Sequence, residues 1–328
     1  MHTLRLCLFL LLLSGCHTQS STPNTTLFTA NVMTIDYRIV IGEALSEEQK
    51  ELVSSIIQNT FSEIDRIYNK WNPDSELSRL NHLPAGKVVA LSPELEHFLL
   101  LTEKFVYISG FRFDPTIEPI QQLWKSKLAL NTIPTDEEIQ ALLPAIGWQH
   151  IHIRSGTFQK DHDATQIDLG AIAKGYAVDL LTERLQANGF PNVFVEWGGE
   201  IRTLGSHPEG RPWNVYISRL QDSNPANALA YLSLKNQAIA TSGDYLQNWT
   251  LNSTTYFHIF NSTTGHPLTR HPSRVSSASV IAPTCMAADV FATSAMTFPN
   301  IHSAKQWASD MEELIPDLKF YLFTDSSF

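Results

Sequence analysis

Residues 167–179, IDLGAIAKGYAVD, constrain this chain more than any other segment, because they join two kinds of secondary structure through a glycine turn. The apolar start predicts a short strand that ends at Asp168, Gly170 allows a tight turn, and the spacing of apolar residues predicts a helix over 171–185. The first backbone N–H groups of a helix lack partners and carry the positive end of the helix dipole, so such a turn can bind a phosphate. Close packing of a helix on a sheet would also explain the glycines.

The N-terminal residues resemble a bacterial lipoprotein signal. Arg5 precedes an apolar run over residues 6–13, which is too short to span a bilayer as a helix and which ends in LSGC. We expect residues 1–15 to be removed and Cys16 to carry the lipid, which would anchor the protein to a membrane on its extracytoplasmic, periplasmic face. An ordinary signal peptide or a retained membrane anchor are the alternatives. Residues 16–29, rich in Ser, Thr, Asn and Pro, predict a flexible tether.

The remaining residues, 30–328, are predicted to form one large domain. Hydrophobic residues make up 43% of the chain, and we find no second long apolar run, no internal repeat and no linker-like break. The formal net charge of −10 argues against a nucleic-acid partner, because no basic stripe is present to neutralise phosphates. Cys7 lies in the signal and Cys16 is the lipid site, so Cys285 is left alone and no intrachain disulfide is expected.

The predicted elements do not alternate regularly as βαβ units, which indicates an α+β fold with a mixed or antiparallel sheet and packed helices. Helices are expected over 46–70, over 92–109 with Ser92 as its cap, and from a capping box at 135–138. Ser75 or Asp74 is expected to cap a short helix, and residues 113–124, which contain two prolines, predict a turn that Asp114 could cap. Strands are expected at 31–42, 150–153, 157–159, 193–197, 201–204, 213–218, 229–234, 238–241 and 256–260.

A candidate metal site lies near the C-terminus. A strand at 279–282 is followed by a helix that begins near Cys285, on which Asp289 and Thr293 are four residues apart and share a face. Mg²⁺ takes oxygen ligands and is usually held by one or two carboxylates together with waters and substrate phosphates. An Asp near a helix start is also favoured by the helix dipole, so this pair alone does not establish a metal site.

Seven segments, taken in order, resemble the ApbE-type flavin transferases, the FAD:protein FMN transferase family: WNPDSELSRLN, FDPT, DLGAIAKGYAVD, WGGEI, TSGDY, HIFNSTTG and ADVFAT. The resemblance runs from about Met33 to about Phe298. It implies an enzyme that binds FAD and Mg²⁺ and transfers FMN to a Ser or Thr hydroxyl of another protein, releasing AMP. The implied acceptor is an exported or outward-facing subunit of a redox pump, such as a sodium-pumping NADH:quinone oxidoreductase. A Mg²⁺-dependent FAD pyrophosphatase and a non-catalytic flavin-binding lipoprotein are the alternatives.

The resemblance also implies roles for the residues that match the family's motifs. The implied metal ligands are the side chains of Asp289 and Thr293 and the carbonyl of Ala171. The implied catalytic residues are His258, which could accept the proton of the attacking hydroxyl, and Lys174, which would add positive charge near the phosphates. The residues expected to line the FAD site are Met33, Trp71, Phe113, Asp114, Asp168, Lys174, Glu200 and Phe260.

Three places depart from the family's usual pattern. Thr34 stands where Gly is usual, and Glu118 replaces another usual Gly and adds a negative charge. Residues 261–265 are NSTTG where Asp-Pro-x-Thr-Gly is usual, and an apparent insertion rich in Arg and His follows over 269–276. None of these changes removes a predicted metal ligand. We expect them to affect FAD affinity and local geometry more than the class of reaction.

Overall fold

The computed structural model describes residues 24–219, 222, 224–244 and 248–325. Its centre is a seven-stranded sheet in which each pair of neighbouring strands is antiparallel, so the α+β prediction is confirmed. The strands, in their order across the sheet, are β1 (Thr26–Val32), β2 (Ile35–Ile41), β6 (Val193–Trp197), β7 (Glu200–Leu204), β10 (Ala238–Gly243), β14 (Ser277–Ala282) and β15 (Lys319–Phe323).

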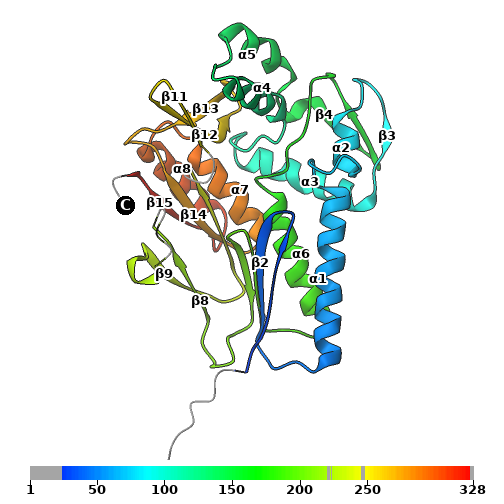
Figure 1. Cartoon of the computed structure of the whole chain (residues 1–328), viewed down its shortest axis with the longest axis vertical. Coiled ribbons are helices and arrows are strands. Elements are labelled where there is room, and N and C mark those ends of the chain that lie inside the picture. The colour runs from blue at the N-terminus through cyan, green and yellow to red at the C-terminus, as the bar shows by residue number, and fades with distance from the viewer. Residues whose placement is uncertain (1–23, 220–221, 223, 245–247, 326–328) are drawn as a thin grey trace, which may run out of the picture.

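Helices cover one face of this sheet and a hairpin covers the other. Figure 1 shows α1 (Glu47–Ile67) and α6 (Ala173–Ala187) running along the sheet, with α7 (Cys285–Met296) beside α6. Val195 belongs to the core that these helices share with α3 (Pro93–Ile108), whereas α8 (Ile301–Leu314) packs against β15. Phe194 points to the opposite face and packs with β8 (Trp213–Ile217) and β9 (Ala230–Leu234).

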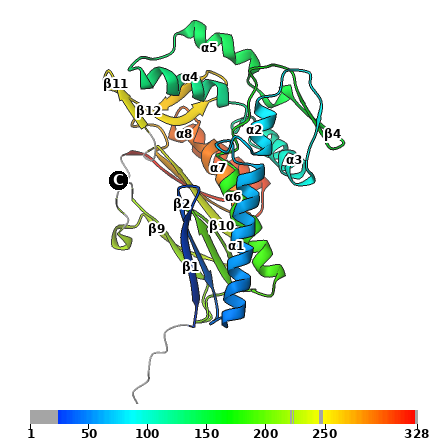
Figure 2. The same cartoon turned by 45° about the vertical axis from the view of Figure 1, so that its right-hand side comes forward.

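Two three-stranded sheets lie beside the main sheet, toward one end of the molecule. Figure 2 shows β11 (Asn248–Leu251) and β12 (Thr254–Asn261) of one of them next to α4 (Glu118–Ala129) and α5 (Asp136–Leu142). That sheet also contains β13 (His266–Thr269), and Phe260 of β12 packs with Trp124 of α4. The other contains β3 (Val89–Ala90), β4 (Ile151–Arg154) and β5 (Thr157–Lys160), near the short helix α2 (Glu76–Asn81).

Four of the predicted helix starts are confirmed by their caps. Ser46 and Thr135 each form a complete capping box, with Gln49 and Glu138 respectively. The hydroxyls of Ser75 and Ser92 accept backbone N–H bonds in the first turns of α2 and α3. These side chains satisfy N–H groups that would otherwise lack partners, which is why a short local pattern locates them.

The predicted single strand over 31–42 is wrong, because the chain reverses inside it. Met33 and Thr34 have φ values of 48° and 65°, and they form the turn of a hairpin between β1 and β2. β1 begins at Thr26, within the range that we predict as a tether, because Thr26 pairs with Ile41. Alternation of apolar and polar residues is the same on both arms of a hairpin, so it does not reveal the turn.

The predicted turn between the prolines at 115 and 119 is confirmed, since Asp114 Oδ1 accepts the Thr116 N–H at 3.0 Å and the Thr116 hydroxyl at 2.6 Å. The helix α4, which follows it from Glu118, was not predicted, and Pro119 lies in its first turn, where a missing N–H costs nothing. The segment predicted as a strand ending at Asp168 is an extended segment with one β-bridge, at Gln166, and the helix after it begins at Ala173 instead of 171. Neither α8 nor β15 is predicted from the sequence.

Cys16 and the rest of the predicted signal lie outside the described residues. Within the described part of the chain, no helix combines the length and the apolar character needed to cross a membrane.

Candidate active site

All of the predicted site residues in the described part of the chain line one cavity of about 720 Å³. The β1–β2 turn, the end of α1, the start of α6, the β6–β7 turn and one face of α7 contribute to its wall. The structure therefore brings together segments that lie far apart in the sequence. The predicted residues in this lining are Met33, Trp71, Phe113, Asp114, Asp168, Ala171, Lys174, Glu200, His258, Phe260, Asp289 and Thr293.

The helices α6 and α7 meet at the floor of this cavity and cap one another. The Gly175 N–H in the first turn of α6 donates to Asp289 Oδ2 over 3.3 Å. In return, Asp179 of α6 accepts the N–H groups of Cys285 and Met286, at 2.8 and 2.9 Å. A Cβ at position 175 would lie 2.5 Å from the Cys285 carbonyl oxygen, so only glycine permits this crossing. Gly175 therefore serves close packing, as the alternative to phosphate binding predicts, but it packs α6 against α7 and not against the sheet.

The residues Lys174, Glu200, Asp289 and Thr293, which we call the acidic end of the cavity, form a buried charged cluster. Lys174 pairs with Glu200, whose side chain is 2% exposed and whose Oε2 has no hydrogen-bond partner among the described residues. Burial and the neighbouring Asp289 charge raise the pKa of Glu200 to about 7, although Lys174 opposes this shift. Burial also raises the pKa of Asp289, which Lys174 and the Gly175 N–H only partly offset.

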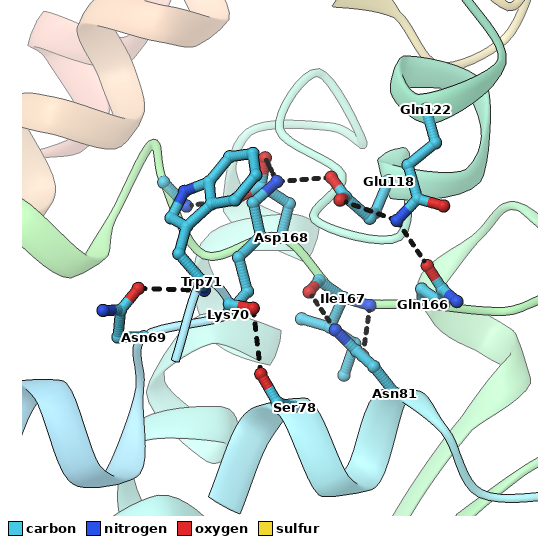
Figure 3. A network of polar contacts seen from close by, with 11 residues as sticks. Asn69, Lys70, Trp71, Ser78, Asn81, Glu118, Gln122, Gln166, Ile167 and Asp168 are labelled. Carbon is cyan, nitrogen blue, oxygen red and sulfur yellow. Dashed lines mark hydrogen bonds and ion pairs between the residues drawn. The ribbon is translucent and has the colours of Figure 1, made fainter. Parts of the chain in front are cut away.

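A second charged region, which we call the polar wall, consists of Lys70, Trp71 and Asp168, which line the cavity, and of Glu118, which pairs with Lys70 (Figure 3). Lys70 forms ion pairs with Glu118 and with Asp168, the latter over 2.9 Å. Burial alone would lower the pKa of Lys70, but the two carboxylates outweigh it and raise that pKa. Burial likewise opposes ionisation of Asp168, yet Lys70 and the Gly170 N–H keep the pKa of this carboxyl below its ordinary value.

The segment that carries Asp168 is held by buried side chains. Asn81 accepts from the Ile167 N–H and donates to the Ile167 carbonyl, at 2.8 and 2.9 Å, so it replaces a strand partner (Figure 3). Asp168 Oδ1 accepts from the Gly170 N–H at 2.8 Å and closes the predicted turn. The buried Lys160 ammonium donates to three carbonyl oxygens, which include that of Asn81. These contacts fix the approach to α6 without a strand.

Residues 33–315 match the model of the ApbE family. The chain belongs to the ApbE family. A Chlamydia pneumoniae protein named FAD:protein FMN transferase is 42% identical to it, over 92% of this chain and 93% of that protein. A Vibrio cholerae protein of the same name is 30% identical over 88% of this chain and 84% of its own length. The solved structure of the flavin transferase ApbE from Vibrio cholerae superimposes with a TM-score of 0.74 at 27% identity, covering 93% of this chain and 98% of that one.

The structure accounts for the places where this ApbE-family chain departs from the usual pattern. Thr34 lies at the positive φ for which glycine is the usual choice, in the turn that borders the cavity. The negative charge of Glu118 is compensated by Lys70. Asn261 keeps its turn closed, because its side chain accepts the N–H groups of Thr263 and Thr264 at 2.9 and 3.1 Å.

The donor set expected for Mg²⁺ in this ApbE-family site fits that ion. Asp289, Thr293 and the Ala171 carbonyl offer only oxygen, and all three residues line the cavity. The described residues contain no group of three or more His, Cys, Asp and Glu that could hold a metal ion. Burial is the main cause of the raised pKa of Asp289, and a cation bound there would favour the ionised carboxylate.

Lys70, Gln121 and Lys125 also line the cavity and were not predicted from the sequence. Lys70 lies just beyond α1 and is 48 residues away from Glu118, so no local pattern connects them. The one available signal was Glu118 itself, because a buried carboxylate in place of glycine calls for a compensating cation. Trp71 was predicted to stack on a flat ligand or to cover the core edge, and at 73% exposure it does not cover the core.

Proposed function

We propose that this protein is a Mg²⁺-dependent FAD:protein FMN transferase that modifies a Ser or Thr hydroxyl of an acceptor protein. The observation that carries the proposal is the meeting of Asp289, Thr293 and Lys174 at the start of α6, inside a cavity large enough for a dinucleotide. The relatives named FAD:protein FMN transferase, which share most of this chain's length, support it.

The proposed reaction is a phosphoryl transfer. The acceptor hydroxyl oxygen bonds to the phosphorus on the riboflavin side of the FAD diphosphate, and the bond from that phosphorus to the bridging oxygen breaks. FMN is then linked to the acceptor as a phosphate ester, and AMP leaves with the bridging oxygen. His258, half-buried in the cavity wall, is assigned to accept the hydroxyl proton. A base of this kind typically contributes roughly 10²–10⁴-fold to the rate.

The remaining site residues bind and orient the dinucleotide. Lys174 and the start of α6 would attract the diphosphate, because both present positive charge. Asp289, Thr293 and the Ala171 carbonyl would hold the Mg²⁺, which when bound supplies neutralisation of phosphate charge. Positioning and charge neutralisation dominate the catalysis of phosphoryl transfer, so this division of roles fits the chemistry.

The location and the acceptor are also part of the proposal. The LSGC signal supports a protein that is lipid-anchored through Cys16 on the extracytoplasmic face of a membrane. An acceptor must then present its hydroxyl on the same face, as an exported or outward-facing subunit of a redox pump would. The family resemblance suggests a sodium-pumping NADH:quinone oxidoreductase or a relative.

The proposal is tested by mixing the purified protein with FAD, Mg²⁺ and a candidate acceptor, and by reading the intact mass of the acceptor. We expect a gain of one FMN phosphoryl group, with equimolar AMP, that disappears with EDTA or with Asp289→Ala. His258→Gln should slow the transfer without preventing FAD binding. Release of free FMN and AMP without acceptor modification would favour a pyrophosphatase, and bound but intact FAD would favour a binding protein.

A further inference from the structure

One face of α4 is directed at the polar wall. Glu118, Gln121, Gln122 and Lys125 have the spacing of a single helix face, and each contacts the wall or supports a residue of it. Glu118 pairs with Lys70, and the Gln122 amide donates to Glu118 Oε1 at 3.0 Å. Figure 3 shows Gln122 behind Glu118, on the side away from the Lys70 ammonium. The Glu118 carboxylate is therefore fixed from both sides.

The same face also reaches Asp168 and Trp71. With its nitrogen turned toward the carboxylates, the Gln121 amide donates to Asp168 Oδ2 at 2.8 Å and to Glu118 Oε2 at 2.9 Å. The Lys125 ammonium lies 5.2 Å from the Trp71 ring centroid, and that of Lys70 lies 4.8 Å from it. Two cations thus lie over one exposed indole, and one of them, Lys70, is paired with two carboxylates.

The backbone beneath the indole is fixed as well. The Ser78 hydroxyl donates to the Lys70 carbonyl at 2.9 Å, and the Trp71 N–H donates to Asn69 Oδ1 at 3.0 Å. The side chains of Lys70 and Glu118 are only 11% and 6% exposed, so their ion pair is shielded from solvent. The Trp71 side chain, in contrast, is open to the cavity.

The charges of the polar wall indicate which part of a dinucleotide can bind there. The Lys70 ammonium is shared between two carboxylates, and with Lys125 the wall is neutral as a whole. A diphosphate therefore gains no net attraction here, whereas at the acidic end the Mg²⁺ of the proposed function would supply the positive charge. A neutral wall with an exposed indole suits a flat heterocycle, which stacks on an aromatic ring and brings N–H groups to a carboxylate.

We propose that Lys70 and Glu118 are positioning residues that hold Asp168 and the Trp71 indole in place for one ring system of the dinucleotide. This proposal rests on the proposed function, because it takes FAD as the ligand. The Glu118 carboxylate fixes the Lys70 ammonium, which in turn orients the Asp168 carboxylate and supports the indole. Glu118 stands where glycine is usual, and its negative charge is balanced by the Lys70 ammonium with which it pairs.

The test compares Lys70→Met, Lys70→Arg, Glu118→Gln and the double variant Lys70→Met/Glu118→Gln. Dissociation constants are measured by tryptophan quenching for FAD, for AMP, for riboflavin and for inorganic pyrophosphate with Mg²⁺. We expect Lys70→Met to weaken FAD and one ring fragment by on the order of tenfold, because two carboxylates then face each other without a cation. Pyrophosphate binding should not change. The double variant should recover part of the loss, and Lys70→Arg should bind FAD as the wild type does.

Lys127→Met is the matched control, because Lys127 also lies on α4 and pairs with a glutamate, Glu138, away from the cavity lining. Equal FAD binding by Lys70→Met and this control would overturn the proposal, as would weakened pyrophosphate binding or no recovery in the double variant. If Lys70→Met does not fold, Lys70→Arg and Glu118→Gln decide the question with the same ligands. Acceptor mass is read separately, so that a wild type that binds FAD but transfers no FMN would refute the proposed function alone.

Discussion

Each of the two charged regions has one ammonium facing two carboxylates, but the pKa values of the carboxyls shift in opposite directions. In the polar wall one ammonium, Lys70, faces the carboxylates of Glu118 and Asp168, and the pKa of Asp168 is lowered. In the acidic end one ammonium, Lys174, faces those of Glu200 and Asp289, and both carboxyl pKa values are raised.

Burial and the supply of donors explain the difference. The Asp168 side chain is 16% exposed, accepts from Gly170 and lies near Lys125, whereas those of Glu200 and Asp289 are almost fully buried. Burial raises the pKa of a carboxyl unless donors or cations offset it, and in the acidic end Lys174 and the Gly175 N–H only partly offset it. In the polar wall Lys70 and the Gly170 N–H outweigh burial at Asp168.

We expect the largest difference between the two regions when one carboxylate charge is removed from each, because the two variants should impair different properties of the enzyme. Asp289→Asn keeps an oxygen for the Gly175 N–H but removes the charge that we propose binds Mg²⁺, so FMN transfer should fall by about 10²-fold or more. Asp168→Asn should weaken FAD binding while the Mg²⁺ concentration for half-maximal transfer stays unchanged. Transfer rates across a Mg²⁺ titration measure both. A shifted Mg²⁺ requirement in Asp168→Asn would mean that the two regions do not act separately.

The next effect concerns the contact that holds the acidic end together. Gly175→Ala places a methyl group against the Cys285 carbonyl, so α6 and α7 must separate, at a cost of about 3 kcal/mol. Gly189→Ala is the control, because φ at Gly189 is +91° but nothing lies near its Cβ, and only backbone strain of about 1 kcal/mol is expected. Urea unfolding gives both values, and equal losses would show that the α6–α7 crossing tolerates a larger residue.

The pH dependence of stability should have opposite signs for the two regions. The pKa of Glu200 rises from its ordinary 4.5 to about 7 on folding, so the folded state binds a proton in this range that the unfolded chain has lost. Stability should therefore fall as the pH rises from 4.5 to 7, and Glu200→Gln should reduce that fall. Asp168, with its pKa lowered from 3.8, stabilises the fold above pH 3.8, and this contribution is lost as the pH falls below that value.

Melting temperatures in EDTA between pH 3 and 8 test both signs, because without Mg²⁺ the acidic end keeps its excess of carboxylates. Asp168→Asn should flatten only the acidic limb of the profile and Glu200→Gln only the limb toward neutral pH. If either variant changed the other limb, the pKa directions assigned to the two regions would be wrong.

The two regions also differ in how much of them the sequence could predict. Lys174, Glu200, Asp289 and Thr293 lie in motifs that the family shares, and the cavity contains all of them. Lys70 and Lys125 belong to no such motif, and Lys125 of α4 approaches Trp71 only through tertiary packing. The helix α4 starts at Glu118, directly after the predicted turn, so the face that carries Lys125 was not predicted.

The fold shows the same limit. Ser46, Ser75, Ser92 and Thr135 cap helices by contacts within a few residues, so their positions are predictable. The left-handed turn at Met33 and Thr34 depends on the pairing of β1 with β2, and the segment at Ile167 depends on Asn81. These structures are decided by tertiary contacts, which local periodicity does not encode.

The smallest effect is expected from Lys125→Met, and it sharpens the assignment of the polar wall. Lys125 touches the indole but forms no short ion pair with Glu118 or Asp168, so its loss removes one cation–π contact and leaves the Lys70 pairs intact. An exposed cation–π contact is worth about 0.5–1 kcal/mol, which corresponds to a two- to fivefold weaker FAD binding. Tryptophan quenching measures it beside Lys70→Met. If Lys125→Met lost more FAD affinity than Lys70→Met, the indole would be supported mainly by the Lys125 ammonium and not by the buried Lys70–Glu118 ion pair.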